Sequence, residues 1–138
     1  MKYTIPIDPK PQSRPRFTSQ GFRRAYEKAD MKAYKRAVAY HVMSQNPKKI
    51  EKGPVAITVR CFIYPPKYIL NVKSKRRALE EETMSVDKKS DLDNYFKAIT
   101  DAVNGILYKD DGQIARMSAT KVYSLNPRTE IEIEEMSL

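Results

Sequence analysis

The sequence predicts an α/β (α+β) fold, in which helices pack on a mixed β-sheet and the elements follow the order β-α-β-α-β-β. Four segments alternate apolar and polar residues, which is typical of half-buried strands. Two longer segments repeat apolar residues every three or four positions, which is typical of amphipathic helices. Strands interspersed with helices indicate a sheet covered by helices. The chain has 138 residues, the usual size of one domain, so residues 1–138 are expected to form a single domain.

Turn-forming residues bound the four expected strands. The first alternating segment stops at Pro9, and the second stops at the Pro65-Pro66 pair. The third and fourth are separated by Asn126-Pro127, which is a turn signal. This short spacing predicts that the last two strands form an antiparallel hairpin. The expected strands are residues 2–7, 54–64, 113–125 and 129–136.

The first expected helix begins at Asp30, a residue type that favours the N-cap position, and runs to about Gln45, before Pro47. Its apolar stripe includes His41, while lysines and arginines lie on the opposite face. The segment before it, residues 12–24, is rich in arginine and is expected to be a loop.

The second expected helix, residues 90–104, has the clearest pattern. Its apolar stripe includes Leu92, Phe96 and Ile99, and Gly105 is well placed to end it. Upstream of it, residues 73–82 are expected to form a short charged helix.

The composition indicates a polyanionic partner. Lysine and arginine number 26 against 17 aspartates and glutamates, which gives a formal net charge of +9. An excess of this size favours nucleic acid as the partner, ahead of an anionic membrane surface. No apolar stretch reaches the length of a membrane span, so no membrane partner is expected.

Cys61 is the single cysteine, and it lies inside an apolar run. One cysteine excludes an internal disulfide and every cysteine-pair zinc motif. The position predicts a small buried hydrophobic side chain rather than a reactive thiol. This cysteine usage fits a reducing, cytoplasmic location.

Acidic residues gather at the start of the second helix. Asp93, Lys97 and Asp101 lie four residues apart and therefore share a helix face other than the buried one. If Asp91 lies just before the helix, its carboxylate can point to the same place as that of Asp93. Two carboxylates at a helix start are suitable ligands for Mg²⁺, which binds oxygen atoms.

A third acid is expected from the segment 109–112, which follows closely enough to fold back beside the helix start. Either Asp110 or Asp111 could supply it, and the spacing does not choose between them. Each acid also has an ordinary structural role, because aspartate caps helices and Asp-Gly pairs form turns. Lys97 four residues after Asp93 is likewise an ordinary surface ion pair. Spacing alone leaves both the metal site and the structural roles open.

Three segments in this region resemble the core motif of the RusA family of Holliday junction resolvases, which are often carried by prophages. The segments read DLDNYFK from Asp91, DAVNG from Asp101 and DDGQI from Asp110. Outside them, the initial strand, the basic Arg-Pro-Arg-Phe stretch and the helix and strand that follow resemble the family more loosely.

The resemblance implies a crossover junction endodeoxyribonuclease, a homodimer that resolves four-way DNA junctions by paired symmetric nicks in DNA recombination and repair. It implies Mg²⁺ as the cofactor, with Mn²⁺ as a substitute, bound by Asp91, Asp93 and Asp111. Lys97 matches the essential lysine of the family and is expected to stabilise negative charge in the transition state. His41 is the single histidine, and its place on an apolar stripe speaks against a histidine-based nuclease mechanism.

DNA affinity is expected from basic clusters outside this acidic region. Contacts of lysine and arginine with phosphates position a substrate without reading its sequence. One cluster lies in the N-terminal third of the chain, and a second precedes the acidic motif. The residues expected to contact DNA are Arg14, Arg16, Arg23, Arg24, Lys32, Lys35, Arg36, Lys73, Arg76 and Arg77.

Two other functions remain open. A non-catalytic basic nucleic-acid-binding protein would keep the basic clusters and use the aspartates only as caps and turns. The combination of DxD and DD motifs speaks against that function. A metal nuclease acting on other branched DNA or on RNA would share the same chemistry, and only its substrates would distinguish it.

Overall fold

A four-stranded mixed sheet forms the centre of the protein in a computed structural model, which describes residues 1–12, 21–88 and 90–137, without the side chains of 21–27. Its strands are β1 (Lys2–Ile5), β2 (Val55–Ile63), β3 (Ile114–Tyr123) and β4 (Arg128–Glu135), in the spatial order β1-β4-β2-β3. β4 pairs antiparallel with β1 and β2, whereas β2 and β3 are parallel. The predicted single-domain α+β class with a mixed sheet is confirmed.

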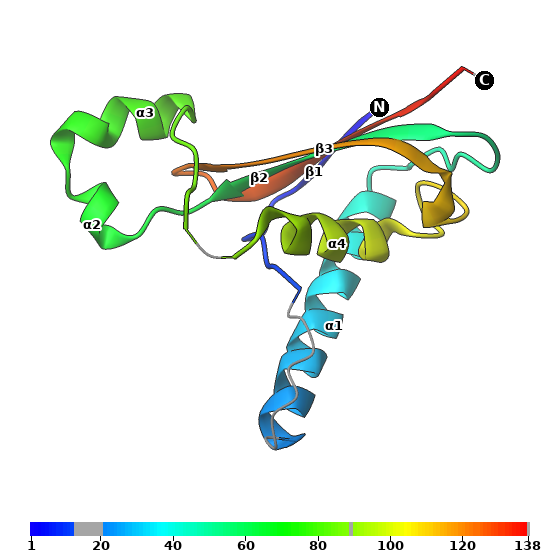
Figure 1. Ribbon diagram of the computed structural model, residues 1–138, viewed down its shortest axis with the longest axis horizontal. Coiled ribbons are helices and arrows are strands. Elements are labelled where there is room, and N and C mark those ends of the chain that lie inside the picture. The colour runs from blue at the N-terminus through cyan, green and yellow to red at the C-terminus, as the bar shows by residue number, and fades with distance from the viewer. Residues whose placement is uncertain (13–20, 89, 138) are drawn as a thin grey trace.

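Two main helices, α1 (Gly21–Met43) and α4 (Leu92–Val103), lie on one face of the sheet (Figure 1). Between β2 and α4 the chain forms two short helices, α2 (Lys67–Leu70) and α3 (Arg76–Glu81), linked by a 3-10 turn. These helices add to the predicted element order, and α3 falls within the charged helix predicted at 73–82. None of the described helices is both long and apolar enough to cross a membrane.

The core lies between the helices and the facing side of the sheet. Ile57 and Val59 of β2 and Ile131 of β4 are buried against Val38 of α1 and Ile99 of α4. Each such side chain contributes about 1.5–3 kcal/mol through the hydrophobic effect. This burial holds α4 in place, so its opposite face can carry polar residues.

The predicted hairpin between the last two strands is wrong. β2 lies between β3 and β4, so the last two strands are not neighbours. The turn from β3 to β4 passes the end of β2, where the backbone amide of Ser124 donates to the carbonyl of Ile63 at 2.9 Å. Alternating residues identify strands that have one buried face, but they do not identify the neighbour with which each strand pairs. The central position belongs to β2, whose residues Val55, Ile57, Val59 and Cys61 are buried.

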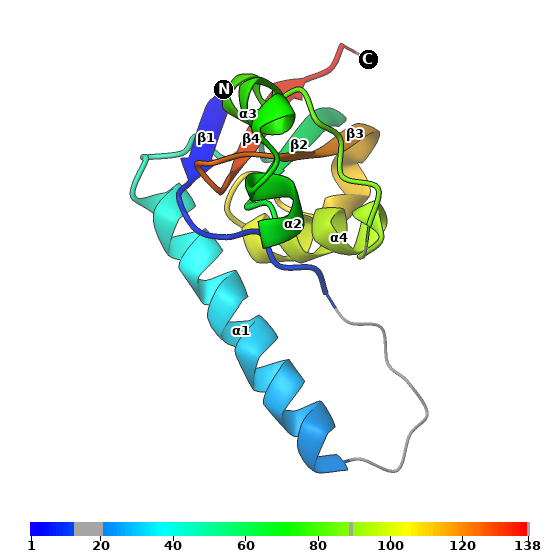
Figure 2. The ribbon, with the colours of Figure 1, turned by 90° about the vertical axis from the view of Figure 1, so that its left-hand side faces the viewer.

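The predicted start of the first helix at Asp30 is also wrong, because α1 begins at Gly21. Residues 23–29 are mostly good helix formers, so the helix continues through the segment instead of starting at the aspartate. Asp30 pairs with Lys10 rather than capping the helix. The N-terminal half of α1 extends away from the sheet (Figure 2).

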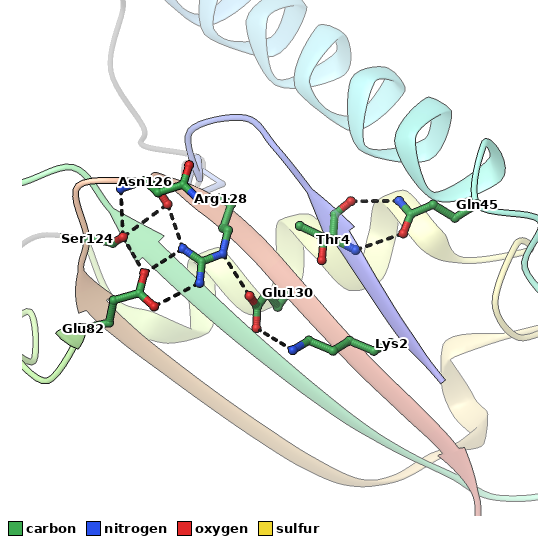
Figure 3. A network of polar contacts seen from close by, with 8 residues as sticks. All are labelled: Lys2, Thr4, Gln45, Glu82, Ser124, Asn126, Arg128 and Glu130. Atoms are coloured by element: carbon green, nitrogen blue, oxygen red, sulfur yellow. Dashed lines mark hydrogen bonds and ion pairs between the residues drawn. The ribbon is translucent and has the colours of Figure 1, made fainter. Parts of the chain in front are cut away.

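A charged network fastens the α2–α3 unit, residues 67–82, to the sheet (Figure 3). Glu82, just after α3, accepts two hydrogen bonds from Arg128 of β4, at 2.7 and 3.0 Å, and one from Ser124 at 2.5 Å. Arg128 also donates to Glu130 at 2.9 Å and lies 3.8 Å from the centre of the Phe62 ring. The bidentate geometry holds α3 at the end of the sheet near which α4 begins.

Candidate active site around helix α4

Asp91 immediately precedes α4 in an extended conformation, with φ −61° and ψ 142°. Asp91 therefore lies before the helix, which is the position required for its carboxylate to point the same way as that of Asp93 in the first helical turn. Although Asp91 occupies the N-cap position, its side chain makes no capping hydrogen bond. Both carboxylates are exposed at the helix N-terminus, where the helix dipole favours anions.

Lys121 of β3 holds the loop that leads into α4. Its ammonium donates to the carbonyls of Lys88 and Ser90, both at 2.7 Å. The backbone of Lys121 also accepts a hydrogen bond from the amide of Val86 at 3.1 Å. Lys121 therefore fixes the position from which Asp91 projects. Sequence reasoning missed this residue, because nothing local to β3 shows that its lysine reaches another loop.

Lys97 lies one turn after Asp93 on the same helix face, as predicted. Its ammonium lies 3.4 Å from a carboxylate oxygen of Asp101, and 61% of its side chain is exposed. The other oxygen of Asp101 lies 3.4 Å from Lys35 of α1. Asp101 thus steadies Lys97 and links α1 to α4. Lys35, which was expected to contact DNA, faces this acid.

Asp110 and Asp111 have different surroundings. The carboxylate of Asp110 accepts a hydrogen bond from the amide of Gly112 at 3.0 Å and so caps the turn η2 (Asp111–Gln113). The side-chain amide of Gln113 accepts from the amides of Lys109 and Asp110, at 2.8 and 3.0 Å, and donates to two carbonyls before β2. Asp111 is exposed, and within the described residues its carboxylate makes no hydrogen bond or ion pair. Asp110 therefore caps the turn, and the carboxylate of Asp111 is available to bind a ligand.

Tyr108 connects Asp111 to α4. Its buried hydroxyl donates to the carbonyl of Thr100 at 2.7 Å. Burial raises the pKa of Tyr108, and the nearby charges of Asp111, Asp101 and Asp110 raise it further. Asp111 therefore lies toward the C-terminal end of α4. A single tyrosine after a glycine carries no signal that would have predicted this link.

The three predicted metal ligands stand at opposite ends of α4. Asp91 and Asp93 lie at its start, beside the end of β3, where Lys121 holds their loop. Asp111 directly precedes the beginning of β3 at Ile114. At about 3.3 Å per residue, the strand from Ile114 to Lys121 spans roughly 23 Å. Over the parts of the chain that the structure describes, no group of three or more His, Cys, Asp or Glu side chains could hold a metal ion.

The expectation that residues 109–112 fold back beside the helix start is therefore not met within one chain. The helix has 12 residues, which at 1.5 Å per residue makes it about 18 Å long. The amide of Gly105 donates to the carbonyl of Tyr108 at 2.9 Å, so the connection turns tightly at the end of the helix. Gly105 adopts a φ of +83°, which side chains other than glycine rarely accept.

The predicted DNA-contacting residues lie on several surfaces. Lys32 and Arg36 of α1 and Lys73 are exposed, whereas Arg76 and Arg77 pair with glutamates one turn along α3. Of the remaining four, Arg14 and Arg16 lie outside the described residues, and Arg23 and Arg24 are described by their helical backbone alone.

The segment before the undescribed residues is anchored to α4. The backbone amide of Gln12 donates to the carbonyl of Asn94 at 3.1 Å. This contact holds the end of the segment 1–12 beside the first turns of α4. Cys61 is buried, and burial raises its pKa to about 12, so its thiol stays protonated as predicted for a core residue.

Two comparisons with known proteins bear on this arrangement. Residues 6–134 match the protein family described as Endodeoxyribonuclease RusA. The chain is also 35% identical over 138 residues to the Bacillus subtilis (strain 168) protein named Uncharacterized protein YqaN, with 99% of this chain and 97% of that protein covered. The family match extends over nearly the whole chain and includes both ends of α4. The chain therefore belongs to the RusA family of endodeoxyribonucleases.

Proposed function

We propose that this chain is a Mg²⁺-dependent endonuclease that resolves four-way DNA junctions by paired symmetric nicks, as a homodimer acting in DNA recombination and repair in the cytoplasm. The proposal rests on two aspartate side chains that have no structural role. Asp91 is at the N-cap position but its side chain does not cap the helix, and the carboxylate of Asp111 makes no hydrogen bond or ion pair among the described residues. Exposed carboxylates without a structural task, in a family of nucleases, are suited to metal binding.

The chemistry of the acid set, defined as Asp91, Asp93 and Asp111, fits Mg²⁺. Carboxylate oxygens are ligands that Mg²⁺ prefers, and the ion usually takes one or two of them together with water and substrate phosphates. A preassembled cage of three carboxylates is therefore not required. When bound, Mg²⁺ or its substitute Mn²⁺ would supply an activated water and would neutralise charge on the phosphate.

A homodimer offers a way to unite acids that one chain keeps apart. In a two-fold dimer, a contact between the start of α4 in one copy and the end of α4 in the other copy occurs twice. Asp91 and Asp93 of one copy would then meet Asp111 of the other, and the dimer would contain two identical sites. Two such sites on a symmetric dimer match the two symmetric nicks that resolve a junction.

Lys97 would act on the phosphate rather than on the fold. Its ammonium is largely exposed and is steadied by Asp101 at 3.4 Å. It lies on the same helix face as Asp93, so a phosphate at the helix start is within reach of its long side chain. There it would stabilise negative charge that develops in the transition state.

The proposed activity is tested with a labelled four-way junction and a linear duplex of the same sequence, each incubated with Mg²⁺, Mn²⁺ or a chelator. We expect paired nicks in opposite strands of the junction, dependent on the metal, and little cutting of the duplex. A protein that binds the junction but leaves it intact in both metals contradicts the enzyme proposal. Equal cutting of duplex and junction contradicts the junction specificity.

The shared site is tested by mixing two inactive variants, Asp93→Asn and Asp111→Asn. If the acids of two copies form each site, a mixed dimer contains one site with both wild-type contributions, and random pairing restores about a quarter of the wild-type sites. If each site lies within one chain, the mixture stays inactive. A mixture of Asp93→Asn with Asp91→Asn is the matched control, because both changes then fall at the same end of α4 and activity should not return.

A further inference from the structure

A pocket lies between the α2–α3 unit and the loop that leads into α4. It has a volume of about 340 Å³, within the range of small-molecule sites. Its lining comes from four parts of the chain: α2, the turn before α3, the loop 84–88 and the end of β3. The lining residues are Tyr68, Ile69, Lys75, Met84, Ser85, Asp87, Lys88 and Tyr123.

We propose that this pocket binds one unstacked nucleobase of the DNA strand that the acids at the start of α4 cut. The inference rests on the proposed function, and it identifies the part of the substrate that this region recognises. The pocket combines an exposed aromatic ring, apolar side chains, hydrogen-bonding groups and cations in one place. This combination suits a base taken out of its stack, which presents an apolar face, a polar edge and an adjacent anionic phosphate.

The aromatic component is Tyr68. Its side chain is 61% exposed, so most of its surface is not used to pack α2 against the rest of the protein. Ile69 beside it is buried and holds the short helix in place. A solvent-facing aromatic ring on an anchored element is a typical stacking platform for single-stranded nucleic acid.

The polar components line the same pocket. Tyr123 is buried, and burial, the nearby Tyr68 and the charge of Asp87 raise its pKa, so its hydroxyl stays protonated and able to donate. Asp87 is exposed and supplies an acceptor. Lys75 and Lys88 place two cations at the pocket, where they can neutralise the phosphates on either side of a bound base.

The pocket is adjacent to the proposed cutting site. Lys121 binds the carbonyls of both Lys88, in the pocket lining, and Ser90, the residue before Asp91. Lys88 and Asp91 are three positions apart in the sequence, which is at most about 11 Å of extended chain. At about 3.4 Å per stacked nucleotide, this distance corresponds to roughly three nucleotides. A base in the pocket would therefore belong to the strand next to the scissile phosphate, where a junction leaves bases unstacked.

The test uses four-way junctions with the fluorescent base 2-aminopurine at successive positions around the expected nick, in chelator so that no cutting occurs. With wild-type protein, one position within three nucleotides of the nick should change its fluorescence on binding. Tyr68→Ala should abolish that change and weaken junction binding between about fivefold and a hundredfold, as loss of one base–aromatic stack does. Tyr68→Phe retains the ring and should behave as wild type.

Tyr40→Ala is the matched control, because Tyr40 is 71% exposed on α1 and lies outside the pocket lining. If Tyr68→Ala and Tyr40→Ala give the same fluorescence and the same affinity, the pocket does not bind a base and the inference is overturned. That result leaves junction cutting in Mg²⁺ untouched. Conversely, a Tyr68-dependent fluorescence change in a protein that never cuts junctions supports the base pocket while contradicting the nuclease proposal.

Discussion

Replacing Arg128 by alanine tests whether charge holds the α2–α3 unit on the sheet. The side chain of Arg128 is 15% exposed and that of Glu82 is 26% exposed. Breaking a buried ion pair by removing one partner costs about 3–5 kcal/mol, and the partial exposure of Glu82 reduces that cost. Loss of the stack on Phe62 adds about 1 kcal/mol. We expect a decrease of roughly 3 kcal/mol in the free energy of unfolding, because these contributions are not additive.

Thermal unfolding followed by circular dichroism measures this effect. For a chain of this size, 3 kcal/mol corresponds to a decrease in Tm of roughly 10 °C. Arg76→Ala is the matched control on the same unit, because it breaks a single pair with Glu80 in which both side chains are more than half exposed. Its Tm should fall by less than about 2 °C. Equal shifts for the two variants would refute the reasoning.

The same variant should change the dependence of stability on pH. The hydrogen bonds from Arg128 hold the pKa of Glu82 below its usual range. A carboxylate whose pKa is lowered by folding stabilises the protein above its unfolded pKa, about 4.3 for glutamate, and this contribution is lost as the pH falls through the lower folded value. The Tm difference between wild type and Arg128→Ala should therefore shrink between pH 7 and pH 3. A difference that stays constant would show that the stack on Phe62, not the ion pair, holds the unit.

Four further predictions concern the proposed site. Replacing any member of the acid set by asparagine should abolish junction cutting, while junction binding persists or tightens. Asp110→Asn should reduce cutting less, because an asparagine oxygen can also cap the turn. Cleavage and gel-shift assays measure both effects, and a larger loss of cutting for Asp110→Asn than for Asp111→Asn would contradict the assignment of Asp111 as the ligand. Lys97→Ala should lose most of its cutting rate with a Tm change below about 2 °C, because its ion pair is exposed; a large Tm decrease would indicate a structural ion pair instead. Lys121→Met should lower the single-turnover cutting rate more than it weakens junction binding, because Lys121 holds both the segment before Asp91 and Lys88 of the pocket lining. Unchanged rates would show that the loop keeps its position without Lys121. Neutralising four arginines should flatten the salt dependence of junction affinity by roughly two units of slope if two of them contact phosphates, and an unchanged slope would place the contacts elsewhere; the four are Arg14, Arg16, Arg23 and Arg24.

Sequence patterns predicted the elements around the site with good accuracy. The stripe through Leu92, Phe96 and Ile99 predicted α4, and it placed Asp93 and Lys97 on a different face from the core. This works because a helix period is a local property that neighbouring residues determine. The helix begins at Leu92 rather than at Ser90, which leaves Asp91 just before it, and Gly105 follows its end with a positive φ, as the pattern predicted. The family motif could be read for the same reason, since its residues lie in three short segments.

Pairing and distance were decided by the tertiary structure. The alternation in β3 could not show that β2, and not β4, is its neighbour, because the same pattern fits any partner. A short connection after Gly105 suggested that residues 109–112, and with them Asp110 or Asp111, return to the helix start. The hydrogen bond of Tyr108 to Thr100 instead keeps this segment near the other end of α4. Both are long-range contacts, which depend on how several elements pack together rather than on the order of residues within one. The sequence by itself therefore predicted the residues that we propose carry the chemistry, and only the folded chain showed that Asp111 lies at the other end of α4 from Asp91 and Asp93.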